Sequence, residues 1–205
     1  MKDNYIHPTA IIDSGVSIGE NNYIGPYCYI TGNTQIGDNN RFEAYCSIGT
    51  PPEHRDYFEQ SIFSVTIGNN CTIREFVTIN SGTIRNTVLY DNITMLRNSH
   101  IGHDSIIENK VNLSCNVLVG GHSYIMEGAN LGLGSMCHQF SVIGAYSMIG
   151  MGGIVVKSSE IHPGEIYVGN PVKFLKENRI GLNRNKITSE KLSELVNKYF
   201  SLSNK

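Results

Sequence analysis

The sequence predicts an all-β solenoid, in which short parallel strands and turns repeat around a shared apolar interior. The first observation is an apolar residue at every sixth position from Leu89 to Val155. The second is that glycine follows several of these positions, as at Gly102, Gly144 and Gly150. An amphipathic helix needs an apolar period near 3.6 and a half-buried strand a period of 2, so a strict period of six fits neither alone. The apolar positions are Leu89, Met95, Ile101, Ile107, Leu113, Val119, Ile125, Leu131, Cys137, Ile143, Ile149 and Val155.

Three of these six-residue repeats make one coil, so residues 18 apart in the sequence are expected to lie one above the other. The N-terminal third follows the same period from Ile6 to Ile48, and polar turn-forming pairs such as Asp38-Asn39 fill the corners. Between Ile6 and Val168 we expect about nine coils, a column on the order of 40 Å long at ordinary strand spacing.

Two interruptions of the period predict loops. Ile67 stands one position beyond a whole coil from Ile48, which we interpret as one coil plus one residue, with residues 50–58 projecting as a loop. Four extra residues precede Leu89 and predict a smaller protrusion over residues 81–86. Loops on a rigid scaffold often carry binding residues.

Residues 1–168 are therefore assigned to the solenoid and residues 169–205 to a helical tail. A short helix is expected over residues 173–179. A clearer amphipathic helix is predicted over residues 188–200, with Thr188 as its cap and an apolar stripe along one side. We expect this tail to pack on the C-terminal end of the solenoid, where strand edges would otherwise be open.

Composition narrows the function classes. A formal net charge of -2 and a pI near 6.4 give no electrostatic affinity for nucleic acid or an anionic membrane. The sequence has no apolar run of the length that spans a bilayer, and residues 1–8 lack the apolar core of a signal peptide. We therefore expect a cytoplasmic protein without an integral membrane segment.

The five cysteines allow two interpretations. Cys28 and Cys46 are one coil apart and should stack, at a spacing close to that of a disulfide. The favoured interpretation is that Cys28, Cys46 and Cys71 are small residues required two positions before a repeat aliphatic residue. No CxxC pair is present, so we do not expect structural zinc.

Side chains that the repeat does not need cluster in the middle of the chain. His100 and His103 flank the inward Ile101, and the coil spacing puts His122 above Asp104 and Gly121 above His103. A metal site would need three or four converging ligands, and the sequence has no HxH or HxxxH spacing. A general base needs one imidazole with a neighbour that fixes its tautomer, and His103 beside Asp104 offers that pair. The remaining alternative is a set of ordinary surface histidines.

At these residues the sequence resembles the UDP-N-acetylglucosamine acyltransferases of lipid A biosynthesis. The resemblance rests on Ile-His-Pro-Thr-Ala at 6–10, Ile-Arg-Glu at 73–75, His-Ile-Gly-His-Asp at 100–104 and His-Gln-Phe at 138–140, with a weaker match at 180–184. It implies a left-handed parallel β-helix, a homotrimer with active sites between subunits, and no cofactor. The acyl donor would be a thioester of acyl carrier protein or coenzyme A.

The resemblance also implies roles by matching position. His103 would be the general base, and the backbone N–H of Gly121 would stabilise the oxyanion. Asp104, His100 and His122 would orient the base or hold the sugar. The acceptor's nucleotide or sugar would be contacted by His138 and Gln139, and its phosphates by Arg184.

The sequence departs from that family in the parts that recognise the acceptor. Asn80-Ser81 stands where the family has a His-Arg pair, and the loop over residues 50–58 is one residue longer. The C-terminal helical part is much shorter, and only Arg184 stands where two basic residues are expected. The chemistry therefore carries over better than the substrate.

We expect an acyltransferase that moves an acyl group from a carrier thioester to a hydroxyl or amine of a nucleotide-activated sugar in surface glycan or lipid biosynthesis. One alternative is an N-acyltransferase acting on a nucleotide-linked amino sugar for O-antigen or capsule. Others are a non-catalytic solenoid scaffold and a γ-carbonic-anhydrase-like enzyme, which needs three zinc-binding histidines.

Overall fold

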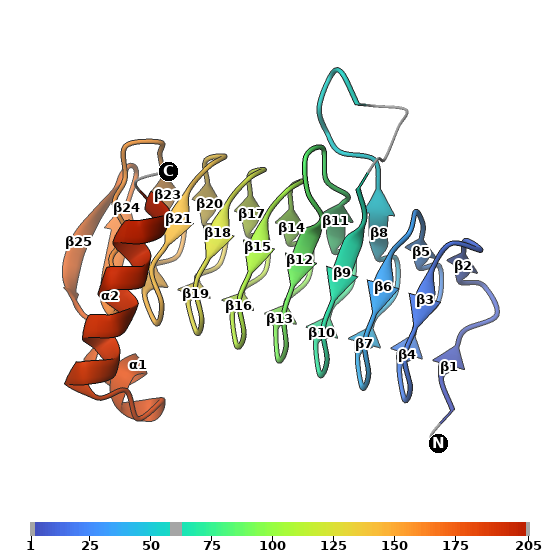
Figure 1. The fold of residues 1–205 in the computed structure, drawn as a ribbon, viewed down its shortest axis with the longest axis horizontal. Helices are drawn as coiled ribbons and strands as arrows, with labels where there is room; N and C mark the ends of the chain where they lie inside the picture. The colour runs from blue at the N-terminus through green and yellow to red at the C-terminus, as the bar shows by residue number, and fades with distance from the viewer. Residues whose placement is uncertain (1–2, 58–62, 204–205) are drawn as a thin grey trace.

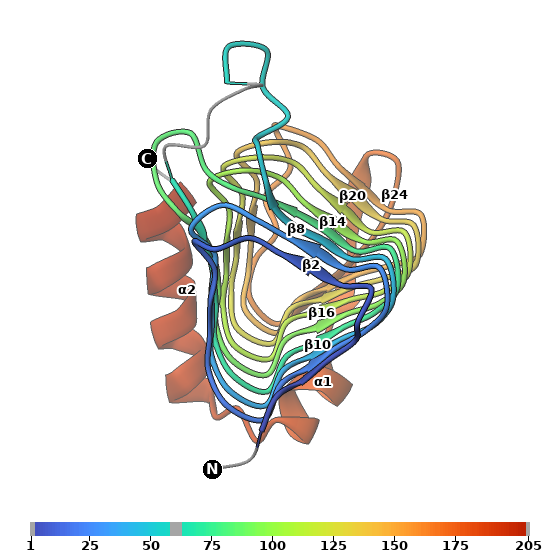
Figure 2. The ribbon, with the colours of Figure 1, turned by 90° about the vertical axis from the view of Figure 1, so that its right-hand side faces the viewer.

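A computed structural model describes residues 3–57 and 63–203. The chain winds into a three-sided column whose faces are parallel sheets, and the coils follow one another along its length (Figures 1 and 2). Seen from the N-terminal end in Figure 2, the chain runs anticlockwise as it recedes, so the coil is left-handed. The predicted left-handed parallel β-helix is confirmed.

The first sheet has ten strands. They are β1 (Tyr5–Ile6), β4 (Tyr23–Ile24), β7 (Arg41–Phe42), β10 (Thr72–Ile73), β13 (Thr94–Met95), β16 (Asn112–Leu113), β19 (Asn130–Leu131), β22 (Met148–Ile149), β24 (Glu165–Gly169) and β25 (Val172–Glu177).

The second sheet has eight strands and the third has seven. The second contains β2 (Ile11–Ile12), β5 (Tyr29–Ile30), β8 (Ser47–Thr50), β11 (Thr78–Asn80), β14 (His100–Ile101), β17 (Leu118–Val119), β20 (Met136–Cys137) and β23 (Ile154–Val155). The third contains β3 (Ser17–Ile18), β6 (Gln35–Ile36), β9 (Val65–Ile67), β12 (Thr87–Leu89), β15 (Ile106–Ile107), β18 (Tyr124–Ile125) and β21 (Val142–Ile143).

The register between coils follows the predicted spacing of three six-residue repeats. Ile101 pairs with Val119, Val119 with Cys137, and Ile107 with Ile125. The inward residues form one apolar core along the column, and Ile101, Ile107 and Ile125 are fully buried in it. Eight coils are completed, and β24 begins a ninth.

The first loop is larger than predicted. In a regular coil Ile36 would pair with position 54, but in the structure it pairs with Ile67. The loop therefore adds to this coil all the residues that separate positions 54 and 67. The expectation of one full coil plus one residue is therefore wrong. A full coil would place His54 and Gln60 in the apolar interior, and neither side chain is apolar. Instead, β8 ends at Thr50, β9 begins at Val65, and the described part of the connection projects from the column (Figure 1). Phe58, the last residue of the predicted loop, lies outside the described residues.

The second loop agrees with the prediction. Ile67 pairs with Leu89 and not with position 85, which leaves four residues beyond one coil. These residues protrude between β11 and β12, beside the first loop (Figure 1).

The tail contains a strand that was not expected. Val172–Glu177 form β25, which pairs antiparallel with β24, so the helix predicted over residues 173–179 is wrong. After the turn at Pro171 the chain stays extended, because the open edge of β24 offers it backbone hydrogen bonds. Two helices follow in the described chain, α1 (Arg179–Arg184) and α2 (Ser189–Ser203).

The long helix matches the amphipathic stretch predicted over residues 188–200. The Thr188 hydroxyl accepts a hydrogen bond from the Lys191 N–H, as a cap should. Leu195 and Tyr199 pack on Met126, Ala145 and Tyr146. The helix therefore lies along the outer face of the last strands of the third sheet (Figures 1 and 2), and not over the end of the column as expected. The edge of the first sheet is covered by β25 instead.

All five cysteines are free thiols, and Cys28, Cys46, Cys71 and Cys137 are buried. Within residues 3–57 and 63–203, neither helix has the length and apolar character needed to cross a membrane.

The buried register predicts that a charge on the inner face is not tolerated. We expect Ile101→Asp and Ile143→Asp each to unfold the column, because an unpaired carboxylate in the core costs an amount comparable with the whole stability of an ordinary domain, about 5–15 kcal/mol. Gln35→Asp is the control, since Gln35 points outward beside the inward Ile36. Thermal melting by circular dichroism measures the effect. Normal melting of both inner-face variants would contradict the register.

Candidate active site

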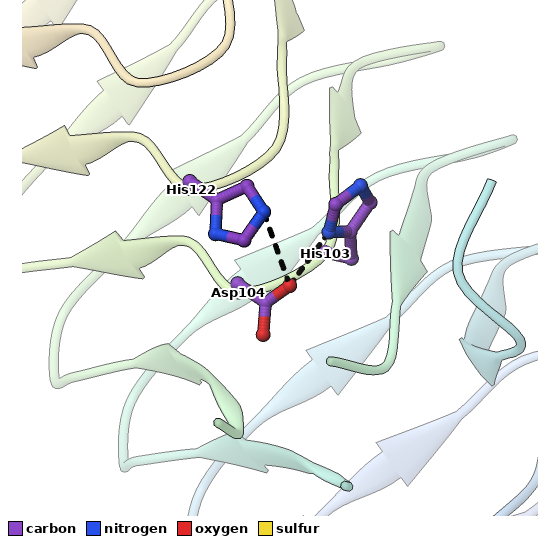
Figure 3. Close-up of side chains that lie close together, drawn as sticks. All are labelled: His103, Asp104 and His122. Carbon is purple, nitrogen blue, oxygen red and sulfur yellow. Dashed lines mark hydrogen bonds and ion pairs between the residues drawn. The ribbon is translucent and has the colours of Figure 1, made fainter. Parts of the chain in front are cut away.

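The centre of the candidate site is an imidazole–carboxylate pair on the corner that follows β14. His103 Nδ1 lies 2.6 Å from Asp104 Oδ2 (Figure 3). The carboxylate only accepts hydrogen bonds when ionised, so the pair places the proton of a neutral His103 on Nδ1. Nε2 then keeps its lone pair and can accept a proton from a substrate.

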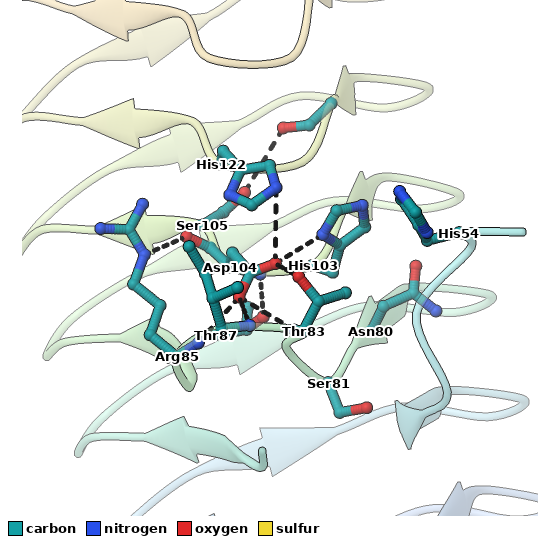
Figure 4. A network of polar contacts seen from close by, with 12 residues as sticks. His54, Asn80, Ser81, Thr83, Arg85, Thr87, His103, Asp104, Ser105 and His122 are labelled. Carbon is teal, nitrogen blue, oxygen red and sulfur yellow. Dashed lines mark hydrogen bonds and ion pairs between the residues drawn. The ribbon is translucent and has the colours of Figure 1, made fainter. Parts of the chain in front are cut away.

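Asp104 is held by the second loop. The carboxylate is fully buried and accepts five hydrogen bonds: from the N–H groups of Thr83, Ile84 and Arg85 at Oδ1, and from the Thr83 hydroxyl and His103 at Oδ2 (Figure 4). The four extra residues before Leu89 thus wrap the carboxylate and fix its position. Arg85 Nε also donates to the carbonyl oxygen of Asp104 at 2.8 Å.

The charge state of Asp104 follows from these contacts. Burial by itself raises the pKa of this carboxyl, but the hydrogen bonds from His103, the Ile84 N–H and Thr83 outweigh it and lower the pKa to about 2. Asp104 is therefore ionised at neutral pH. An ionised partner stabilises the imidazolium that forms when His103 accepts a proton.

Two further histidines surround the pair. His122 Nε2 lies 3.6 Å from Asp104 Oδ2, and its ring stacks on Phe140 with centroids 4.4 Å apart. Burial lowers the pKa of His122, although the charge of Asp104 partly offsets this. His100 Nδ1 lies 2.8 Å from the Thr78 hydroxyl, and burial lowers its pKa as well. Both rings are therefore biased toward the neutral form.

Gly121 lies one coil beyond His103, as the spacing predicted. A Cβ at Gly121 would come within 2.8 Å of His103 Nε2 and Cε1, so the absence of a side chain makes room for the imidazole. Gly121 does not take the positive φ of a tight turn, and the adjacent His122 takes that conformation instead, with φ 59°. Among the described residues, the Gly121 N–H donates to no protein acceptor.

A groove of about 380 Å³ runs beside the pair. His100, His103, Gly121 and Gln139 line it, so four of the predicted site residues meet there. Glu53, Asn80 and Met136 are among the lining residues that were not predicted as site residues. Glu53 belongs to the first loop, and Asn80 belongs to the Asn80-Ser81 pair that departs from the resembling family. The irregular stretches of the sequence were therefore the signal that could have identified these two residues.

The first loop also reaches the base. The His54 ring stands edge-on to the His103 ring, with centroids 5.9 Å apart (Figure 4). Asn80 Nδ2 donates to the Pro51 carbonyl oxygen at 3.0 Å and thereby ties the start of this loop to β11. Together the loop and the neighbouring coils leave His103 only 7% exposed.

The other predicted residues lie apart from this pair. His138 is exposed and its Nδ1 lies 2.8 Å from the carbonyl oxygen of the adjacent Gln139. Arg184, at the end of α1, lines a different hollow of about 460 Å³ on the first sheet, together with Asn130 and Tyr146. Within one chain the structure does not bring Arg184 to His103.

His103, Asp104 and His122 offer one atom each within 4.8 Å, the only such cluster of possible metal ligands in the part of the chain described. The five donors on Asp104 and the direct contact to His103 Nδ1 already use the lone pairs that a cation would need. The cluster contains two histidines, whereas the γ-carbonic-anhydrase-like alternative needs three. Its geometry fits an oriented base better than a ligand set.

Comparison with known proteins gives consistent matches. The family model described as bacterial transferase hexapeptide (six repeats) matches residues 1–32 and 15–50. An acyl-[acyl-carrier-protein]–UDP-N-acetylglucosamine O-acyltransferase of Sinorhizobium fredii is 39% identical over 124 residues, which are 59% of this chain and 45% of that protein. The chain spans about half the length of the curated relatives that it matches.

Solved structures agree over most of the chain. A UDP-N-acetylglucosamine acyltransferase of Bacteroides fragilis superposes with a TM-score of 0.77 at 31% identity, covering 95% of this chain and 83% of that one. The enzyme of Francisella novicida gives a TM-score of 0.81 at 28% identity, with 95% and 78% covered.

The lowered pKa of Asp104 predicts a stabilisation that is present at neutral pH and changes with pH only in the acid range. An unfolded carboxyl binds its proton near pH 4, so the stabilisation by ionised Asp104 is present above that pH and is lost as the pH falls toward 2. We expect Asp104→Asn to lower the free energy of unfolding by roughly 3 kcal/mol at pH 7, through its buried hydrogen bonds.

Urea unfolding of both proteins from pH 7 to pH 2.5 measures this difference, which should shrink steadily below about pH 4. Asp56→Asn is the control, because Asp56 is exposed. A difference that does not change with pH would contradict the assigned ionisation.

Proposed function

Because the chain belongs to the family of hexapeptide-repeat acyltransferases, we propose that it transfers an acyl group from a carrier thioester to a nucleotide-activated sugar. The donor is a thioester of acyl carrier protein or coenzyme A, used as a co-substrate, with no further cofactor. The acceptor is a hydroxyl or an amine of the sugar, in the biosynthesis of a bacterial surface glycan or lipid. The named activity of the relatives, acylation of UDP-N-acetylglucosamine from acyl carrier protein, supports this proposal.

The single observation that carries the proposal is that a candidate base, His103, and a backbone N–H without an acceptor in the described chain, that of Gly121, line the same groove. His103 Nε2 removes the proton of the acceptor group as that group attacks the thioester carbonyl carbon. The Gly121 N–H donates a hydrogen bond to the oxygen that becomes negative. The C–S bond then breaks, and the imidazolium returns the proton to the leaving thiolate. Asp104 holds His103 in the required tautomer throughout.

We propose that His100, His122 and Gln139 contact the sugar beside the base, since they lie on or beside the groove. His138 and Arg184 belong to the nucleotide end of the acceptor. Arg184 needs a neighbouring subunit to share a site with His103, which supports a homotrimer with active sites between subunits. A cytoplasmic location supplies both the thioester and the nucleotide sugar.

The function is tested by release of free thiol from acyl-acyl carrier protein and acyl-coenzyme A in the presence of UDP-N-acetylglucosamine and related nucleotide sugars. We expect thiol release that depends on both substrates. No release with any combination would overturn the proposal.

The base assignment predicts the effect of His103→Gln. We expect the rate of acyl transfer to fall by about 10²–10⁴-fold, because the amide cannot accept the proton. The melting temperature should change little, since the ring lies at a corner and not in the apolar core. Near wild-type turnover by this variant would refute the assignment, and His7→Gln, in the exposed first coil, serves as the control.

The packing of Gly121 predicts the effect of Gly121→Ala. The new Cβ would lie 2.8 Å from His103 Nε2 and must displace the ring or the N–H. Loss of an oxyanion donor is worth about 3 kcal/mol, so kcat should fall by roughly 100-fold. Gly152→Ala is the control, since it carries the strain of φ +65° in open space. A Gly121→Ala variant that loses stability but keeps its specific activity would reject the role of this N–H.

A further inference from the structure

The groove beside His103 offers hydrogen-bond acceptors and negative charge to whatever enters it. Glu53 lines it, and among the described lining residues there is no lysine or arginine. Two imidazoles also line it, and the pKa of His100 is lowered by burial, which keeps that ring neutral. The charged group of this chain in the groove is therefore a carboxylate, which favours a basic group over an anionic one.

Asn80 adds an acceptor that has no partner. The residue is only 4% exposed, and its Nδ2 donates to the Pro51 carbonyl oxygen at 3.0 Å and to the Thr50 hydroxyl at 3.2 Å. The Pro51 oxygen can only accept, so these contacts fix which end of the amide is nitrogen. Oδ1 is left buried with no hydrogen bond. A buried carbonyl oxygen without a donor is uncommon in folded proteins, and it indicates a missing partner.

The residue that carries the unpaired oxygen lines the same groove as His103. Asn80 ends β11, whose Ile79 pairs with Ile101, so Asn80 stands one coil before Gly102 and beside the base. Figure 4 shows Asn80 on the same side of the network as the rings of His54 and His103. The side chain that this position offers to the groove is an uncharged amide.

We propose that the acyl acceptor is a primary amine of a nucleotide-linked amino sugar, and that Asn80 and Glu53 select it over a hydroxyl. This inference rests on the proposed acyl transfer and names its substrate class. A hydroxyl nucleophile has a single proton, which it gives to His103. A neutral amine has two N–H groups, so it can give one to His103 Nε2 and the other to Asn80 Oδ1, with its lone pair directed at the thioester carbon. Oδ1 is buried in the structure of the free chain, so the proposal includes a shift of Pro51 and the Asn80 side chain when the acceptor binds.

The step balances without any further reactant. The amine nitrogen forms a bond to the acyl carbon, and the C–S bond breaks. One amine proton passes through His103 to the leaving sulfur, so the products are an amide and a free thiol. The second N–H stays on the amide nitrogen.

The test uses two acceptors that differ only at the acylated carbon: UDP-N-acetylglucosamine, which carries a 3-hydroxyl, and its 3-amino-3-deoxy analogue. Thiol release from acetyl-coenzyme A and from acyl-acyl carrier protein gives kcat/KM for each acceptor. We expect the full-length wild type to prefer the amine by at least about 100-fold, because a hydroxyl leaves the buried acceptor unpaired.

Two variants assign the preference to the residues. Glu53→Gln keeps the shape and removes the charge, and Asn80→Ala removes the acceptor. Each should reduce the amine-to-hydroxyl ratio by about 10-fold or more, whereas Glu20→Gln, in an exposed turn of an early coil, should leave it unchanged. Melting curves show whether Asn80→Ala still folds, and Glu53→Gln tests the proposal independently if it does not.

Each outcome is decisive. A wild type that prefers the hydroxyl, or a ratio unchanged in both variants, overturns the amine assignment while acyl transfer stands. Absence of thiol release with either acceptor overturns acyl transfer itself, and the amine assignment falls with it.

Discussion

The parallel register between successive coils is the constraint on which the rest of the structure depends. Most strands are very short, so no strand is stable alone and each depends on hydrogen bonds to the coils on either side. The inward aliphatic residues stack in the same register and form one continuous core. A shift of one residue would move every apolar side chain outward. The repeat therefore fixes each corner position to within one coil of its neighbours.

The site uses this constraint directly. His103 and Gly121 are on equivalent corners of adjacent coils, so the register itself brings the imidazole and the peptide N–H together. The same register puts His122 next to Asp104. The repeat cannot by itself bury a carboxylate at a corner, however, and the four residues inserted before Leu89 supply the donors that do so. One insertion thus sets the charge of Asp104 and, through it, the tautomer of His103 in the candidate pair.

The sequence predicted the regular features well because they repeat. A periodic pattern or a capping residue predicted four features: the coil of three six-residue repeats, the pairing of Gly121 with His103, the protrusion over residues 81–86 and the long C-terminal helix. Irregular features were predicted poorly. The first loop is predicted, but its length is underestimated, because the insertion happens to place Ile67 only one position beyond a whole coil from Ile48. The local sequence of β25 predicts a helix, whereas its extended form is determined by the partner strand β24. The roles of Glu53 and His54 depend on where a loop folds back, and no local pattern encodes that.

Chemistry and specificity consequently reside in different parts of the chain. The base, its carboxylate partner and the N–H donor occupy repeat positions, which any chain that keeps the register will align. The groups that we propose to meet the acceptor come from departures from the repeat: Glu53 and His54 from the long loop, and Asn80 at the start of the short one. The two loops are also tied together, because Asn80 donates to Pro51 and the Ser81 N–H donates to the Thr50 carbonyl oxygen. A change in the long loop therefore alters the surface beside the groove while the hydrogen bonds from the short loop keep Asp104 in place. This separation allows the surface beside the groove to vary while His103, Asp104 and Gly121 keep their repeat positions.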